Sequence, residues 1–475
     1  MKEAVINDPS FSYDIHSLLS AFYPGEKISV KETEAGEGGG FFMLFEGEEI
    51  SAEIPGDMER PQVKNLIKRR VYEYLSGLCG KTLPWGTLTG IRPTKIPMKL
   101  LREGRTDAEI AAYMKDVYLT SDEKIGLITR IARREIKLID SLHGQDGFSI
   151  YIDIPFCPSR CMYCSFTSYP IEAFKDKVPD YIRALKKEMD LYSRIYAGRP
   201  LDTVYIGGGT PTTLTADQLK ELIDHLMGSF DLSSVREFTV EAGRPDSFSE
   251  EKLKTLKDLG VDRISVNPQT MNDKTLELIG RKHSAKETKE AFKMARAAGF
   301  TNINMDLILG LPGEDKEDVR FSFDEIVKLE PDSITVHSLT VKRAAKMAEY
   351  LGANPDMVCV NAAEMSDIAE NAAKALSMKP YYLYRQKNGN FDTGADLGGA
   401  AIENTGYARC GCMGIYNIVI MEEIQSIAAM GAGAVSKRVR GPRDIKRTDN
   451  YKDVMLYIND TDKLMEKKKN FYGIM

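Results

Sequence analysis

The strongest constraint on the fold is an alternation of strand and helix patterns that begins after Gly147. Short apolar runs rich in β-branched residues are followed by segments with helical spacing, as in FSIYIDI and then VPDYIRALKKEMDLYSRIY. Six such strands occur, and the last is DSITVHSL. Because parallel neighbours require long crossovers, this alternation predicts a parallel sheet covered by helices. The expected class is α/β, an open partial (β/α)6 barrel rather than a closed barrel of eight units.

Two regions of different character flank this barrel. The first sixty residues alternate apolar with acidic or glycine-rich stretches, which predicts a small sheet with hairpins; helical spacing then continues to Leu142 around the loop LPWGTLTGIRPTK. We therefore expect a mixed α+β N-terminal accessory domain over residues 1–144 and the barrel over 145–345. Residues 346–475 hold further helices and strands and predict a C-terminal domain that caps the barrel mouth and covers the substrate.

Composition narrows the class of protein. The chain has 475 residues, more than one hydrophobic core usually fills, and no apolar run approaches the ~20 residues that a membrane span needs. Its N-terminus, MKEAVINDPS, lacks the features of a secretory signal, and seven cysteines do not suggest a disulfide framework. The expected location is cytoplasmic. A net charge of -6 argues against binding to nucleic acid.

Three cysteines within eight residues form the most informative motif. The stretch IPFCPSRCMYCSF directly follows the first strand of the predicted barrel and contains Cys157, Cys161 and Cys164. Three thiolates cannot complete a structural zinc site, whereas an iron-sulfur cube held by three cysteines leaves one iron open to a small molecule. A zinc site completed from elsewhere remains an alternative. His143, or the pair Cys410 and Cys412, would then supply the missing ligand.

Polar and glycine-rich motifs follow the other five strands. The carboxyl ends of parallel strands meet at one edge, where such sheets bind ligands. The glycines of YIGGGTPTTL allow a close approach of the backbone to a ligand, and Glu241 and Gln269 can form hydrogen bonds with ribose hydroxyls. Arg281 and Asp306 are expected at the same edge, and Tyr163 lies between two cysteines.

Together these motifs resemble a known family. CPSRCMYC fits the CxxxCxxC signature of the radical S-adenosylmethionine (radical SAM) superfamily. YIDIPFC, GGGTPT and DLILGLPGE are similar to the oxygen-independent coproporphyrinogen III oxidases. TGIRPTK, YYLYRQKN and GIYNIVIMEE resemble the HemZ-type branch, called coproporphyrinogen dehydrogenase. The resemblance extends from about Leu83 to Lys437.

The resemblance implies a [4Fe-4S] cluster held by the three cysteines, with S-adenosylmethionine on the fourth iron. The residues that it implies around S-adenosylmethionine are Tyr151, Tyr163, Gly208, Gly209, Thr210, Glu241, Gln269, Arg281 and Asp306. The implied reaction converts coproporphyrinogen III to protoporphyrinogen IX: a 5'-deoxyadenosyl radical removes hydrogen from a propionate, which then loses carbon dioxide and one electron. Two propionates react, so two S-adenosylmethionine molecules are consumed. A flavodoxin or ferredoxin is the implied electron donor.

Basic side chains are the natural partners of the four propionates of this substrate. The candidates for contact with the substrate are Arg92, Lys95, Lys342, Arg343, Arg385 and, at the end of the sixth strand, His337.

One position departs from the pattern of the family. The best-known oxidases carry a further cysteine two positions after the third ligand, where this chain has Phe166, and relatives with Phe there include haem chaperones. A haem-binding chaperone, or another radical SAM enzyme that modifies tetrapyrroles, such as a methyltransferase, is therefore an alternative. TGIRPTK, YYLYRQKN and the long N-terminal region favour the dehydrogenase-like branch.

Overall fold

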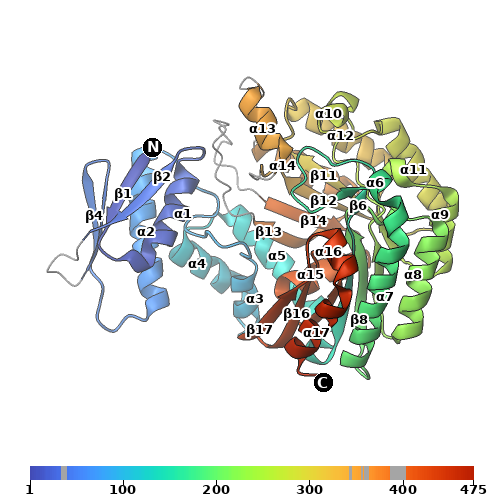
Figure 1. Cartoon of the computed structure of the whole chain (residues 1–475). Helices are drawn as coiled ribbons and strands as arrows, with labels where there is room; N and C mark the ends of the chain where they lie inside the picture. Colours follow the sequence, from blue (N-terminus) through green and yellow to red (C-terminus); the bar gives the residue numbers. More distant parts are fainter. Residues whose placement is uncertain (34–39, 342–344, 355–356, 358–362, 386–402, 475) are drawn as a thin grey trace.

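The structure is a computed structural model that describes residues 1–475 except 34–39, 342–344, 355–356, 358–362, 386–402 and 475. An eleven-stranded sheet forms its centre, with the order β13-β14-β12-β11-β10-β9-β8-β5-β15-β16-β17 (Figure 1). The six predicted strands lie side by side and parallel within it. They are β5 (Phe148–Ile154), β8 (Leu201–Gly208), β9 (Glu237–Val240), β10 (Arg263–Ser265), β11 (Ile303–Leu309) and β12 (Ser333–Ser338). The sheet stays open, because β5 and β12 pair with other strands, and the predicted partial barrel is confirmed.

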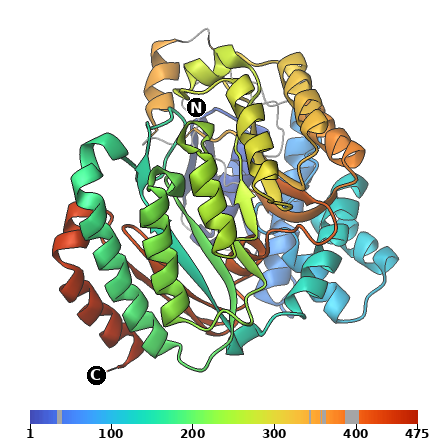
Figure 2. The same ribbon diagram turned by 90° about the vertical axis from the view of Figure 1, so that its right-hand side faces the viewer.

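Helices cover the outer face of these strands (Figure 2). The crossover helices are α7 (Val178–Ile195), α8 (Ala216–Ser229), α9 (Glu250–Asp258), α11 (Ala285–Ala297) and α12 (Lys316–Leu329). At the start of α8, the side chain of Thr215 accepts a hydrogen bond from the N–H of Gln218, and the side chain of Gln218 accepts one from the N–H of Thr215. Ser284 and Glu287 form the same capping box at the start of α11. In α8 the buried side chains are Ala216, Leu219, Leu222, Ile223 and Leu226. This spacing of the apolar residues places them on one helix face, against the sheet.

The last third of the chain extends the sheet at both sides. Next to β12, β14 (Glu403–Ala408) and β13 (Lys379–Arg385) add antiparallel strands. Next to β5, β15 (Ser426–Met430) pairs in parallel, and β16 (Val435–Gly441) and β17 (Asp444–Asp449) follow. The helices of this region are α13 (Lys346–Ala353), α14 (Ala363–Ala375), α15 (Ile415–Glu422), α16 (Val454–Asn459) and α17 (Thr461–Tyr472). The domain boundaries at 144 and 345, and a covering role for this region, stay predictions.

Helix α15 packs against the face of the sheet opposite to the crossover helices. The ring centroid of its Tyr416 lies 4.6 Å from that of Tyr205 on β8 and 6.0 Å from that of Tyr151 on β5. Glu237 accepts hydrogen bonds from the first two backbone N–H groups of this helix, those of Ile415 and Tyr416. The stacked rings therefore pack inside the open barrel, on the face of the sheet away from the crossover helices.

The N-terminal region folds around a core of its own. Its sheet has the order β2-β1-β3-β4. The strands are β1 (Lys2–Ile6), β2 (Ile28–Glu32), β3 (Phe41–Phe45) and β4 (Glu48–Ala52). The expected hairpin is confirmed as β3–β4, whereas α1 (Ser12–Phe22), which links β1 to β2, was not expected.

Short helices α6 (Ile171–Phe174) and α10 (Asp273–Leu278) lie within the barrel, and four further helices connect the N-terminal sheet to the central one. They are α2 (Arg60–Cys79), α3 (Lys95–Arg102), α4 (Asp107–Tyr118) and α5 (Asp122–Ile139). Leu383 of β13 joins the core that α3, α4 and α5 share with Trp85. Among the described residues, no helix combines the length and apolarity that crossing a membrane requires.

Candidate active site

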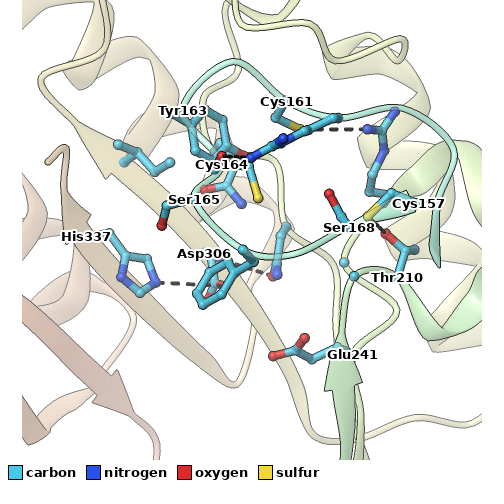
Figure 3. A pocket seen from close by; sticks show the side chains of 18 of the residues that line it. Cys157, Cys161, Tyr163, Cys164, Ser165, Ser168, Thr210, Glu241, Asp306 and His337 are labelled. Carbon is cyan, nitrogen blue, oxygen red and sulfur yellow. Dashed lines mark hydrogen bonds and ion pairs between the residues drawn. The ribbon is translucent and has the colours of Figure 1, made fainter. Parts of the chain in front are cut away.

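A cavity of about 760 Å³ opens at the carboxyl edge of the parallel strands, a size typical of small-molecule sites (Figure 3). All six barrel strands, or the loops that follow them, contribute residues to its wall. The predicted residues that line it are Cys157, Cys161, Tyr163, Cys164, Gly208, Gly209, Thr210, Glu241, Gln269, Arg281, Asp306 and His337. The convergence expected from the motif positions is therefore present in the fold.

The three cysteines lie on the loop of residues 155–170, here called the cysteine loop. Backbone hydrogen bonds fix both its ends and its middle. At its ends, β6 (Phe156–Cys157) pairs with β7 (Tyr169–Pro170). In its middle, the N–H of Met162 donates to the carbonyl of Ile279 at 3.0 Å, and the carbonyl of Met162 accepts from Met347 at 2.9 Å. The loop that carries the thiols is thus held by segments that follow β10 and β12.

Two glycines allow the loop after β8 to pack directly against the cysteine loop. The N–H of Gly209 donates to the carbonyl of Ile154 at 2.9 Å. A Cβ at Gly209 would lie 2.7 Å from the carbonyl oxygen of Phe156 and 3.0 Å from Cys157 Sγ. Gly208 has φ of +105°, which side chains disfavour. Both positions therefore require glycine.

Buried arginines and a hydroxyl surround the thiols. Thr210 Oγ1 donates to Cys157 Sγ at 3.5 Å, and Arg244 Nη1 lies 3.7 Å from Cys161 Sγ. Burial raises the pKa of the Cys157 thiol to about 11. Arg281 is also buried, and among the described residues its Nε has no hydrogen-bond partner. Three thiols beside two fixed guanidinium groups suit a negatively charged metal cluster and an anionic ligand next to it.

Two acidic side chains of the described residues line the cavity, and their pKa values are shifted in opposite directions. Burial raises the pKa of Glu241 to about 7, and this side chain accepts a hydrogen bond from the hydroxyl of Tyr205. Burial acts in the same direction on Asp306, but hydrogen bonding and charge from His337, with a bond from Asn304 at 2.7 Å, outweigh it and lower the pKa of Asp306 below its ordinary value. Near neutral pH, the carboxyl group of Glu241 thus holds a proton more readily than that of Asp306.

Gln269 adopts a strained backbone conformation at the cavity wall. Its φ is +70°, and its N–H donates to the carbonyl of Asp306 at 3.0 Å. Non-glycine residues held in the left-handed region concentrate at ligand sites, because the surrounding structure must compensate for the strain. The conformation thus supports the prediction that Gln269 contacts a ligand.

Tyr151 is the one predicted cofactor residue that does not line the described cavity. Its hydroxyl donates to Asp153 Oδ2 at 3.0 Å, and its ring lies in the tyrosine stack with Tyr205 and Tyr416. Burial raises the pKa of Asp153 to about 8. Tyr151 therefore packs against residues next to the cavity and does not line the cavity itself. Direct contact of Tyr151 with S-adenosylmethionine stays a prediction.

Three of the six residues predicted to contact the substrate lie elsewhere in the structure. Arg92, Lys95 and Arg385 do not line the described cavity. Arg92 pairs with Glu423 at 3.2 Å, and Lys95 is exposed at the start of α3. Lys342 and Arg343 lie outside the described residues.

Arg385 is bound to the loop between α2 and α3. Its Nη1 donates to the carbonyl of Leu88 at 2.5 Å, and its guanidinium group lies 4.9 Å from the centre of the Trp85 ring. Trp85 in turn donates to Glu403 at 2.7 Å. The stacking of Arg385 on Trp85 gives this arginine a structural role, because a planar cation stacks well on an aromatic face.

Sequence reasoning missed two arginines at the cavity. Arg160 is exposed within the cysteine loop, and Arg244 follows β9. The available signal was their position, one between two cysteines and the other directly after a strand that ends at the cavity edge.

The two suggested sources of a fourth zinc ligand are wrong. His143 Nδ1 lies 2.7 Å from Asp202 Oδ1, at the start of β8. The N–H of Cys412 donates to the carbonyl of Arg409, whose own N–H donates to the carbonyl of Asp332 just before β12. Cys410 lies in the same turn. These residues occupy the amino edge of the sheet, whereas the three cysteines lie at the carboxyl edge.

Comparison with known proteins gives a consistent assignment. The sequence pattern of the Radical SAM superfamily matches residues 151–326. The chain is 42% identical over 407 residues to the oxygen-independent coproporphyrinogen-III oxidase-like protein HemZ of Bacillus subtilis, and the match covers 83% of this chain and 78% of that protein. It is 44% identical over 199 residues to the heme chaperone HemW of the same organism, covering 41% of this chain and 51% of HemW.

A solved structure of coproporphyrinogen III oxidase (HemN) from Escherichia coli, described as a radical SAM enzyme, has the same fold, with a TM-score of 0.51. It is 21% identical, and the match covers 70% of this chain and 72% of HemN. The superfamily implies a [4Fe-4S] cluster and S-adenosylmethionine, which fit the three thiols and the unpartnered Arg281 Nε at one cavity of the described structure. The chain belongs to the radical SAM superfamily and, within it, to the family of oxygen-independent coproporphyrinogen-III oxidase-like proteins.

Proposed function

We propose that this chain is an oxidoreductase that converts two propionates of coproporphyrinogen III to vinyl groups, giving protoporphyrinogen IX. The observation that carries this proposal is the extent of the similarity to HemZ, which covers 83% of the chain and so extends beyond the barrel. The similarity to HemW covers only 41% of the chain. Residues outside the shared barrel are those expected to select the substrate.

The three cysteine thiols would hold the cluster at three of its irons. When bound, the cluster supplies the electron that splits S-adenosylmethionine into methionine and a 5'-deoxyadenosyl radical. Around this ligand, Glu241 and Gln269 would orient ribose hydroxyls, and the Nε of Arg281, which has no partner among the described residues, would bind a carboxylate. Fixed donors and acceptors of this kind hold the reactive carbon against one substrate hydrogen.

Substrate binding would use the outer part of the cavity. Arg160 is an exposed cation on the cavity wall, and its one hydrogen bond in the described structure is a 3.5 Å contact with the carbonyl of Cys164. A guanidinium group in that position is suited to bind a propionate. His337 and Tyr384 line the same cavity from β12 and β13. Transfer of one hydrogen atom to the 5'-deoxyadenosyl radical, loss of carbon dioxide and passage of one electron to the oxidised flavodoxin or ferredoxin would convert each bound propionate to a vinyl group.

One anaerobic assay tests the proposal. Reconstituted protein receives S-adenosylmethionine, coproporphyrinogen III and reduced flavodoxin or ferredoxin, and the products are separated by chromatography. We expect two molecules of 5'-deoxyadenosine for each protoporphyrinogen. The matched control is Cys161→Ala, which should bind little iron and form neither product. Formation of 5'-deoxyadenosine by wild-type protein without a vinyl product would contradict the proposed substrate and leave the reaction class intact.

A second candidate function is that of a haem chaperone. Two observations favour it: the 44% identity to HemW within the barrel, and Phe166, whose side chain is 69% exposed at the cavity wall. An exposed aromatic ring offers an apolar surface to a planar tetrapyrrole. Titration with haem, followed by transfer to an apo-haemoprotein, would support this function if it occurs without any vinyl product in the assay above.

A further inference from the structure

Arg244 makes a set of contacts that join the loop after β9 to the cysteine loop. Its Nε donates to Asp246 Oδ1 at 2.9 Å, and its Nη2 donates to Asp246 Oδ2 at 2.6 Å. Its Nη1 donates to both the carbonyl and the hydroxyl of Ser159 at 3.0 Å. The same Nη1 lies 3.7 Å from Cys161 Sγ, within reach of a hydrogen bond to sulfur. Only 3% of Arg244 is exposed.

The geometry directs one N–H group of this guanidinium at a sulfur. Asp246 binds the guanidinium in a two-point contact, which fixes the plane and rotation of the group. Nη1 is consequently aimed at Ser159 and Cys161. His283 lies 4.0 Å from Asp246, but burial lowers the pKa of His283 to about 4, so it adds no positive charge at neutral pH. Arg244 therefore places a positive charge within hydrogen-bond reach of Cys161 Sγ.

A fixed cation next to a cysteine ligand has two physical effects on an iron-sulfur cluster. Hydrogen bonds to the sulfurs and the local net charge help set the reduction potential of such clusters. The reduced cluster carries one more negative charge, so a nearby guanidinium stabilises it more than the oxidised cluster. Burial strengthens this interaction, because water screens it poorly. The bonds to Ser159 also restrain the residue that lies two positions before Cys161.

We propose that Arg244 is a positioning residue for the cluster, which restrains Cys161 through Ser159 and raises the reduction potential of the cluster through its N–H group at Cys161 Sγ. The proposal depends on membership of the superfamily and not on the identity of the tetrapyrrole. It can therefore be tested without any substrate, and failure of the coproporphyrinogen assay would not affect it.

The test is a redox titration of the reconstituted cluster in the full chain, without S-adenosylmethionine and followed by electron paramagnetic resonance. In Arg244→Gln we expect the ratio of reduced to oxidised cluster at a fixed potential to fall about tenfold, which is a shift of about 59 mV to more negative potential for one electron. Arg244→Lys should shift the reduction potential in the same direction by a smaller amount, because it keeps the positive charge but loses the two-point contact with Asp246. The matched control is Arg236→Gln, the same charge change just before β9, where the side chain bonds to Ser141.

Specific outcomes would overturn the proposal. A wild-type potential in Arg244→Gln would do so, and so would an equal shift in Arg236→Gln, which would indicate an effect of overall charge. If Arg244→Gln holds no cluster, Arg244→Lys decides the question, and a wild-type potential in that variant overturns the proposal. Iron release to a chelator should also be faster in Arg244→Gln than in Arg236→Gln, and equal rates would contradict the restraint on Cys161. Circular dichroism of each variant checks the fold.

Discussion

Replacing Gly209 with alanine should separate the cysteine loop from the loop after β8. The new Cβ would lie 2.7 Å from the carbonyl oxygen of Phe156, 3.0 Å from the carbonyl oxygen of Ile154 and 3.0 Å from Cys157 Sγ. Two of these atoms belong to the backbone and have no rotamer to change. Relief of the contact therefore requires the two loops to move apart.

The cost can be bounded from the hydrogen bonds at this contact. Moving the loops apart lengthens the bond from Gly209 N–H to Ile154 and the 2.7 Å bond from Thr210 N–H to Phe156. Each is worth about 0.5–1.5 kcal/mol, so the free energy of unfolding should fall by about 1–3 kcal/mol. Retaining both bonds with a compressed Cβ costs a similar amount, about 1–3 kcal/mol. Either route also displaces Cys157.

Two measurements check this prediction. Urea unfolding followed by circular dichroism should show the loss of stability, and iron analysis after anaerobic reconstitution should show a lower cluster content. The matched control is Gly228→Ala in α8, where, apart from the adjoining residues and the backbone of the helix itself, no atom of the described residues lies within 4 Å of the position that the new Cβ would take. That substitution should be neutral or stabilising by up to about 1 kcal/mol. Wild-type stability and iron content in Gly209→Ala would refute the reasoning.

Three further predictions concern single side chains. Burial raises the pKa of Asp153 to about 8, so this carboxyl group favours the folded state at low pH, and its contribution to stability is lost as pH rises from about 4 through 8. Asp153→Asn should therefore flatten the fall of the urea midpoint between pH 5 and 8.5. An unchanged dependence of the urea midpoint on pH would contradict this. Arg385→Gln should lower stability by about 1–2 kcal/mol and shift the fluorescence of Trp85, with the KM for coproporphyrinogen unchanged; a raised KM would return Arg385 to the substrate site. Arg160→Gln should raise that KM about tenfold while 5'-deoxyadenosine still forms, and an unaltered KM would remove Arg160 from the proposed site.

Local patterns in the sequence predicted the core of the fold well. The six barrel strands and their helices follow from period and capping, which depend on neighbouring residues. The pairing of β15 with β5 could not be predicted in this way, because Ser426 meets Phe148 from a distant part of the chain. Helix α1 was missed although its apolar residues have helical spacing, since the acidic and glycine-rich stretches around it suggested strands throughout.

The candidate site was predictable where a motif marked the end of a strand. The cysteines and most of the residues predicted to surround S-adenosylmethionine were chosen by this rule, and they line one cavity of the described structure. The roles of arginines were harder to predict, because a long charged side chain can bind any acceptor within reach. Arg92 and Arg385 bind partners in other segments, and the contact of Arg244 with Cys161 joins loops that follow different strands.

The placement of β15 beside β5 has a consequence for how the protein is made. Strand β5 leads directly into the cysteine loop, and its second neighbour comes from residues near the end of the chain. On the ribosome, which releases the N-terminal part first, β5 keeps an open edge until Met430 has emerged. An open edge is a template for unwanted association. Loading of the cluster before that point would place the metal beside a half-enclosed strand, so we expect cluster loading to follow the synthesis of β15.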